Sequence, residues 1–131
     1  MRPTAIIPKI QRGTMDCGLV TLEMYTSLPY VQIAEVAKRV TPHAHNGLWV
    51  RELLRLAWAL QVKLRRLPQP EQWEEHDCGI LLVSFKAERK TMRHWLLWFE
   101  GVLINPADGL VWKPDAYLAS RKLVGAFVEV E

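Results

Sequence analysis

The chain has 131 residues, of which 50% are hydrophobic and 24% charged, with a formal net charge of +3. This length fits a single domain over residues 1–131 that buries an ordinary core, and the composition excludes a disordered or fibrous chain. Basic residues are scattered, and no apolar run approaches the length of a membrane span, so we expect no nucleic-acid partner and no membrane segment. The N-terminus does not resemble a signal peptide, and two free thiols suit a cytoplasmic protein.

The first half of the chain predicts three helices. After a looping lead-in, apolar residues at helical spacing predict a helix over about 16–26, with Thr14 or Asp16 as its N-cap. A second helix has Pro29 in its first turn, and a third covers about 48–60.

The second half predicts mainly strands. Alternating or continuous apolar runs indicate strands at 62–67, 79–85, 94–99, 102–104 and 123–130. We also expect a helical turn near 71–75 in a polar loop and a short helix within 113–120. Helices followed by an antiparallel sheet place the fold in the α+β class.

The tripeptide Asp-Cys-Gly occurs twice, and its surroundings separate the two copies. Cys17 lies in the first turn of the first predicted helix, where amide groups and the helix dipole are expected to stabilise a thiolate. Gly18 would let a substrate approach the backbone closely. Cys78 precedes a buried strand, so we interpret it as a structural thiol. With His76 it supplies only two ligands, so no metal site is expected.

His94 is the histidine best placed to act as a base. His43, His45 and His76 lie in polar stretches and are expected on the surface, whereas His94 opens a predicted strand. The next strand ends in Asn-Pro-Ala-Asp-Gly, where Asn105 or Asp108 could orient an imidazole. Neighbouring antiparallel strands would bring His94 and Asn105 together. Cysteine at a helix start, then histidine, then asparagine, is the order of a papain-like site.

Five motifs in order resemble the peptidase C39-like family, which are cysteine peptidases of papain-like fold. The stretch QRGTMDCGLVTLEM (11–24) resembles the N-terminal signature of the family. GLWVRELLRLAWAL, CGILLVSF, HWLL and NPADG then resemble its helix, its buried strand, its histidine strand and its final turn. The family includes domains that cleave double-glycine leader peptides from bacteriocin precursors.

The resemblance implies a role for each matching residue. Cys17 would be the nucleophile and His94 the general base, while Gln11 would donate to the oxyanion together with the Cys17 backbone amide. Asn105 stands where the family has aspartate and would orient His94, with Asp108 as the rival. Trp95, beside His94, would line the site with Gly18. Such an enzyme needs no metal or organic cofactor, and its partner is a peptide or protein substrate.

Two other functions are compatible with the same sequence. One is a catalytically silent domain that binds a peptide without cutting it, for which the change from aspartate to Asn105 is the hint. The other is a papain-like amidase or isopeptidase that acts on another amide, because this fold hosts several chemistries.

The six tryptophans are interpreted mainly as core residues, because most lie in apolar periodic runs. Trp73 and Trp112, in predicted loops, are the best candidates for exposure.

Overall fold

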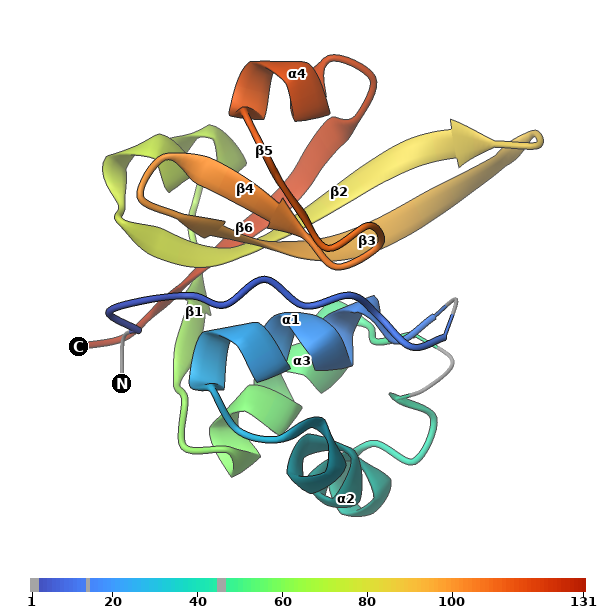
Figure 1. Cartoon of the computed structure of the whole chain (residues 1–131), viewed down its shortest axis with the longest axis vertical. Helices are drawn as coiled ribbons and strands as arrows, with labels where there is room; N and C mark the ends of the chain where they lie inside the picture. The colour runs from blue at the N-terminus through green and yellow to red at the C-terminus, as the bar shows by residue number, and fades with distance from the viewer. Residues whose placement is uncertain (1–2, 14, 45–46) are drawn as a thin grey trace.

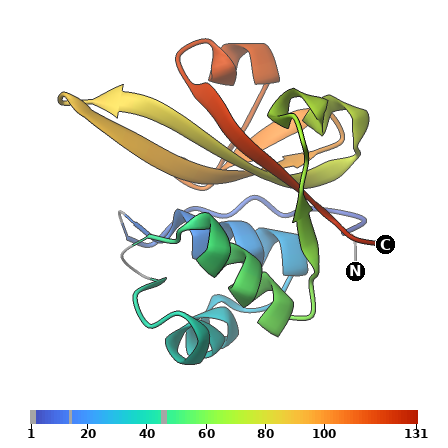
Figure 2. The same cartoon turned by 180° about the vertical axis from the view of Figure 1, so that it is seen from behind.

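The chain folds into a layer of helices packed on an antiparallel sheet, as described by a computed structural model for residues 3–13, 15–44 and 47–131. Figure 1 shows α1, α2 and α3 on one side of the sheet and α4 on the other, and Figure 2 shows the same layers from behind. The helices are α1 Cys17–Thr26, α2 Tyr30–Val40, α3 Val50–Ala59, the 3-10 helix η2 Pro70–Glu75 and α4 Pro114–Leu118. The strands are β1 Leu64–Arg66, β2 Cys78–Ala87, β3 Lys90–Phe99, β4 Val102–Asn105, β5 Leu110–Trp112 and β6 Lys122–Glu129. The predicted α+β class is confirmed.

The sheet has the order β1-β6-β2-β3-β4-β5, and every pairing is antiparallel. Its central strands are buried on both faces, which explains why they appear in the sequence as continuous apolar runs. In β3, Trp95 and Leu97 pack toward α1–α3, whereas Leu96 and Trp98 pack in the second core with Tyr117 of α4. Strand alternation thus makes two cores from one run of residues.

Helix α1 is buried from Cys17 to Tyr25, because it is apolar on nearly all sides and lies between the sheet and the other helices. The N-terminal segment runs between α1 and the sheet (Figure 1). It is tied to both layers, since Lys9 N–H donates to Met24 Sδ at 3.3 Å and Gln11 N–H donates to the Pro106 carbonyl at 2.7 Å. In the part of the chain that the structure describes, no helix combines the length and the apolar character needed to cross a bilayer.

The structure extends or corrects several predicted elements. Strands β2 and β3 continue into a long hairpin whose turn residues, Glu88 and Arg89, have φ values of 49° and 69°. Strand β5 was not predicted, because three residues are too few to show an alternating pattern. Its apolar residues Leu110 and Val111 are also exposed and so do not mark a buried face. Thr14, one of the two predicted N-caps, lies outside the described residues.

The tryptophan predictions are wrong in part. Trp73, expected to be exposed, is 4% exposed and packs edge-on against Trp98. Trp49, just before α3, and Trp58, within it, are 72% and 62% exposed, because both side chains point away from the helix face that meets the core.

Gly79→Ala should destabilise the fold by about 3 kcal/mol or more, because the site has no room for a methyl group. A Cβ at Gly79 would lie 2.3 Å from the Trp98 ring and 2.4 Å from the Phe127 carbonyl oxygen. Gly101→Ala is the matched control, since its Cβ meets open space and only its φ of 82° is unfavourable, at about 1–2 kcal/mol. Urea unfolding measures both variants. Equal losses would contradict the packing described for β2.

Candidate active site

Cys17 lies where the helix layer meets the edge of β3. It is the first residue of α1, and its exposed fraction is 7%. Strand β4 pairs with β3 only at Leu97–Phe99. Just before this ladder, the backbone N–H of Trp95 points to Cys17 Sγ. The thiol therefore lies beside the peptide bond that joins His94 to Trp95.

Burial raises the pKa of the Cys17 thiol above its ordinary value. The backbone N–H groups of Trp95 and Gly18 favour the thiolate and oppose part of this rise, while the Asp16 carboxylate adds to it. The amide group at the helix start thus favours the thiolate as expected, but the net shift of the Cys17 pKa is upward. The loss of hydration outweighs the nearby amide groups, and the resting group is a neutral thiol.

His94 and Asn105 are brought together, as strand adjacency predicts. His94 Nε2 lies 2.6 Å from Asn105 Oδ1, and this oxygen also accepts the Ala107 N–H at 3.1 Å. A backbone N–H can only donate, so the atom of Asn105 at this position is the oxygen. His94 Nε2 must then carry the proton that it shares with Asn105. Neutral His94 is left with its lone pair on Nδ1, which is the form that a general base requires.

The surroundings of His94 keep its ring neutral. Burial lowers its pKa below the ordinary value, the hydrogen bond to Asn105 opposes this, and the charge of Arg121 lowers it further. Within the described structure, no hydrogen bond joins the His94 ring to Cys17 Sγ. The resting pair is accordingly a neutral imidazole and a neutral thiol that are not yet engaged.

Asp108, the alternative orienting residue, is occupied elsewhere. Its Oδ1 accepts the Leu110 N–H at 2.9 Å, and its Oδ2 accepts Trp112 Nε1–H at 2.9 Å. Asp108 thus fixes the start of β5 and its tryptophan. Asn105 is the residue in contact with His94, and its role in orienting the ring stays a prediction.

Gln11 lies beside the turn that Asn105 begins, because its backbone N–H donates to the Pro106 carbonyl. Its side-chain Nε2 donates to the Gly13 carbonyl at 2.7 Å. Its Oε1 is buried and has no hydrogen-bond partner among the described residues. One of the two Nε2 hydrogens is therefore available to a ligand. The role of Gln11 as oxyanion donor is compatible with this arrangement and stays a prediction.

Gly18 and Trp95 serve packing in this structure. A Cβ at Gly18 would lie 2.7 Å from Leu48 Cδ1 and 3.2 Å from Trp95 Cδ1, so glycine allows the segment before α3 to close onto α1. Trp95 is 2% exposed and donates its Nε1–H to the Leu48 carbonyl at 2.9 Å. Their predicted contacts with a substrate stay predictions.

The other candidates lie apart from this site. Cys78 begins β2 and is 5% exposed in the helix-side core. His43 is exposed, His76 is half-buried, and His45 lies outside the described residues. Over 3–13, 15–44 and 47–131, no group of three or more His, Cys, Asp or Glu side chains is arranged to hold a metal ion.

The contacts of Asp16 differ from those that the sequence interpretation predicted. It occupies the N-cap position of α1, but its side chain makes no capping hydrogen bond, so the predicted capping role is wrong. Its carboxylate instead accepts hydrogen bonds from the backbone of Arg12 and Gly13 and from the Tyr30 hydroxyl. No sequence pattern signals these contacts, because Tyr30 reaches Asp16 only when α2 folds against α1.

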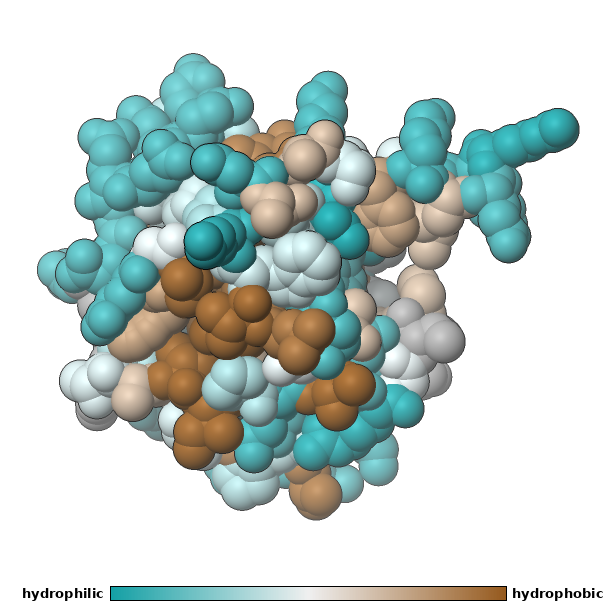
Figure 3. Space-filling view, turned by 45° about the horizontal axis from the view of Figure 1, so that its top comes forward, coloured by the Kyte–Doolittle hydropathy of each residue, from teal (hydrophilic) through white to brown (hydrophobic). Residues whose placement is uncertain are grey.

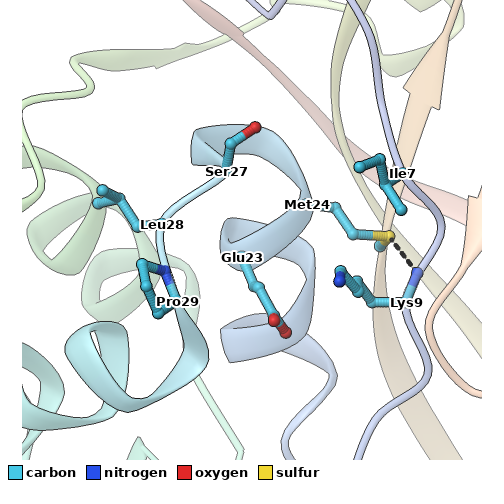
Figure 4. A pocket seen from close by; sticks show the side chains of 7 residues that line it. All are labelled: Ile7, Lys9, Glu23, Met24, Ser27, Leu28 and Pro29. Carbon is cyan, nitrogen blue, oxygen red and sulfur yellow. Dashed lines mark hydrogen bonds between the residues drawn. The ribbon is translucent and has the colours of Figure 1, made fainter.

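A surface pocket lies toward the C-terminal end of α1 (Figure 4). Its lining comes from the N-terminal segment, α1 and the connection to α2, namely Ile7, Lys9, Glu23, Met24, Ser27, Leu28 and Pro29. None of these residues belongs to the group around Cys17, so this pocket is separate from the candidate active site.

Comparison with known proteins supports the fold. No protein-family model and no curated sequence matches the chain. Among solved structures, it is similar to the peptidase domain of Streptococcus mutans ComA, at 13% identity and a TM-score of 0.58, over 95% of this chain and 99% of that one. A second similar structure is the peptidase domain of Streptococcus ComA, a bifunctional ABC transporter involved in quorum sensing, at 14% identity and a TM-score of 0.53, over 93% of this chain and 96% of that one. The chain has the papain-like α+β fold of these domains.

The pH dependence of the alkylation rate of Cys17 tests whether this residue is a neutral thiol in the resting protein. In a Cys78→Ala protein, the rate with iodoacetamide should rise about tenfold per pH unit between about pH 7 and 8, because only the thiolate reacts and its pKa is raised. Intact-mass spectrometry over time gives the rate. A rate that is already constant below about pH 7 would indicate a thiolate–imidazolium pair and contradict this description.

Proposed function

We propose that the chain is a cysteine peptidase in which Cys17 attacks a peptide carbonyl and His94 is the general base. The observation that carries the proposal is the His94–Asn105 pair, which leaves the lone pair of Nδ1 free. The backbone N–H of Trp95, the residue after this base, favours the Cys17 thiolate, which supports a thiol close to His94. The fold shared with two peptidase domains supports the same conclusion.

The proposed reaction moves two protons in turn, each of them through His94 Nδ1. His94 Nδ1 takes the proton from Cys17 Sγ as the sulfur bonds to the carbonyl carbon, and the π electrons move to the oxygen. The imidazolium then protonates the leaving amine, the C–N bond breaks, and an acyl-enzyme remains. Nδ1 next deprotonates a water that attacks the acyl carbon, and the proton returns to the departing Cys17 sulfur. Because Asn105 Oδ1 accepts the Nε2–H, it stabilises the imidazolium in both steps.

Two features of the resting structure define what substrate binding must change. Cys17 Sγ and the His94 ring share no hydrogen bond, so a side-chain rotation has to bring them together, as is common when a free enzyme meets its substrate. Gln11 Nε2 must also direct its second hydrogen at the oxyanion, alongside the Cys17 backbone N–H.

Exposed apolar side chains flank this region and suit an apolar peptide segment. Ile10, beside Gln11, is 58% exposed, and Leu110 is 57% exposed. Ile10 Cβ lies 3.3 Å from the position of a Cβ on Gly109, so Ile10 lies against the turn that precedes Leu110. Figure 3 shows that hydrophobic side chains gather in one area of the face it displays. We infer that the substrate is a peptide with apolar residues near the cleaved bond.

A catalytically silent peptide-binding domain is the second candidate. The unengaged thiol, its burial and the hydrogen bond of Gln11 to Gly13 favour it. Hydrolysis of a fluorogenic peptide library distinguishes the two, because a silent domain binds peptides without releasing the fluorophore. A parallel panel of isopeptide and cell-wall amide substrates covers the amidase alternative.

Cys17→Ala and His94→Ala should each lower kcat for a hydrolysed peptide by at least about 10³-fold, because each removes a group that acts in bond cleavage. Cys78→Ala is the matched control, since it removes the other buried cysteine side chain. It should retain activity within about twofold. Full activity in the Cys17→Ala protein would exclude the proposed mechanism.

Asn105→Asp should shift the acidic limb of the activity profile to higher pH. The base must be neutral, so activity falls as the pH drops through the pKa of His94, which burial places below its ordinary value. A carboxylate at position 105 stabilises the imidazolium and raises that pKa, so the loss begins at higher pH. Asp108→Asn should move the limb only slightly, to lower pH, because the Asp108 charge raises the pKa of His94 but is the smallest of the influences on it. A limb that moves with Asp108→Asn and not with Asn105→Asp would assign the orienting role to Asp108.

A further inference from the structure

The loop of residues 11–13 is organised by one buried carboxylate. Asp16 is 4% exposed, and its Oδ1 accepts the Gly13 N–H at 3.0 Å. Its Oδ2 accepts the Arg12 N–H at 3.1 Å and the Tyr30 hydroxyl at 2.9 Å. Hydrogen bonds to a charged acceptor in a buried place are the strong ones, so Asp16 holds two successive peptide groups of the loop.

The side chain of Gln11 is attached to the same loop. Gly13 donates its N–H to Asp16, and its carbonyl accepts the Gln11 Nε2–H at 2.7 Å. The backbone of Gly13 is therefore held by Asp16 through its N–H, and its carbonyl in turn holds the side chain of Gln11. A tilt of this backbone would turn the Gln11 amide with it, because the two are joined by a short hydrogen bond.

Tyr30 connects this arrangement to α2. The pKa of Tyr30 is raised to about 12, mainly by burial and by its hydrogen bond to Asp16, so its hydroxyl stays a donor at neutral pH. The Arg12 guanidinium lies 4.1 Å from the centroid of the Tyr30 ring and forms an ion pair with Glu23 of α1 at 3.0 Å. Arg12 thus covers the face of the tyrosine whose hydroxyl fixes Asp16.

We propose that Asp16 and Tyr30 are positioning residues, which orient the Gln11 amide toward the oxyanion through the peptide group of Gly13. This inference rests on the proposed function, in which Gln11 is the oxyanion donor. Neither side chain needs to touch the substrate, since both act through Gln11.

A double-mutant cycle tests the coupling, with p-nitrophenyl acetate as an activated ester that acylates cysteine nucleophiles. Tyr30→Phe should lower kcat about tenfold and change KM less than about twofold, because the loss concerns the transition state. Gln11→Ala should lower kcat by about 10²–10³-fold. In the double variant, Tyr30→Phe should add less than about twofold, because the residue through which it acts is already absent.

Tyr25→Phe is the matched control. It removes a tyrosine hydroxyl that donates to a carboxylate, Glu129 Oε1, at 2.7 Å, but in the second half of α1. It should leave kcat within about twofold, whereas Asp16→Asn should reproduce the loss seen with Tyr30→Phe. Multiplicative effects of Tyr30→Phe and Gln11→Ala, or an equal loss in Tyr25→Phe, would overturn the positioning role while the proposed function stands.

An inert wild-type protein would overturn the proposed function, and hydrogen exchange would then decide whether the loop is held as described. Tyr30→Phe should speed exchange of the Arg12 and Gly13 amides about tenfold relative to Tyr25→Phe, as measured by ¹⁵N NMR. The reason is that the Asp16 carboxylate, which accepts both amides, loses the hydroxyl that holds it in place. Unchanged exchange of both amides would overturn the inference in that case as well.

Discussion

The candidate site depends on one oxygen atom, Asn105 Oδ1. Two donors reach it, the Ala107 N–H at 3.1 Å and His94 Nε2–H at 2.6 Å. The first is a backbone group that cannot reverse its role, so it fixes which atom of the asparagine is the acceptor. That in turn fixes the tautomer of His94 and leaves the lone pair on Nδ1. A neutral amide thus contacts the imidazole where the resembled family has a carboxylate, and its orienting role stays a prediction.

Burial at this site disfavours the charged forms of Cys17 and His94 that the proposed reaction requires. Burial raises the pKa of Cys17 and lowers that of His94, so the resting pair is uncharged. Forming the ion pair requires proton transfer into an environment with few compensating charges, and the aspartate that would favour the imidazolium is absent. A neutral thiol of this kind reacts slowly without a specific base, and in the proposed reaction its activation comes from a rearrangement on substrate binding. The same features would be retained in a domain that binds peptides and does not cut them.

The spacing of apolar residues predicted most of the helices and strands, whereas contacts between elements distant in the sequence could not be predicted. The helices and the buried strands follow from apolar spacing, and the meeting of His94 with Asn105 follows from the adjacency of antiparallel strands. Strand β5 was missed because three residues with exposed Leu110 and Val111 carry no pattern. The bond between Asp16 and Tyr30 joins residues on two helices, and the burial of Cys17 arises only when the chain has packed. Both therefore depend on tertiary structure.

A crystal structure of the protein treated with a peptidyl aldehyde tests the central claim most directly. The account predicts a bond from Cys17 Sγ to the aldehyde carbon, with the hemithioacetal oxygen about 3 Å from Gln11 Nε2. It also predicts that His94 Nδ1 faces the sulfur while Nε2 stays on Asn105. An adduct on Cys78, or a peptide bound with Cys17 unmodified and still apart from His94, would contradict it.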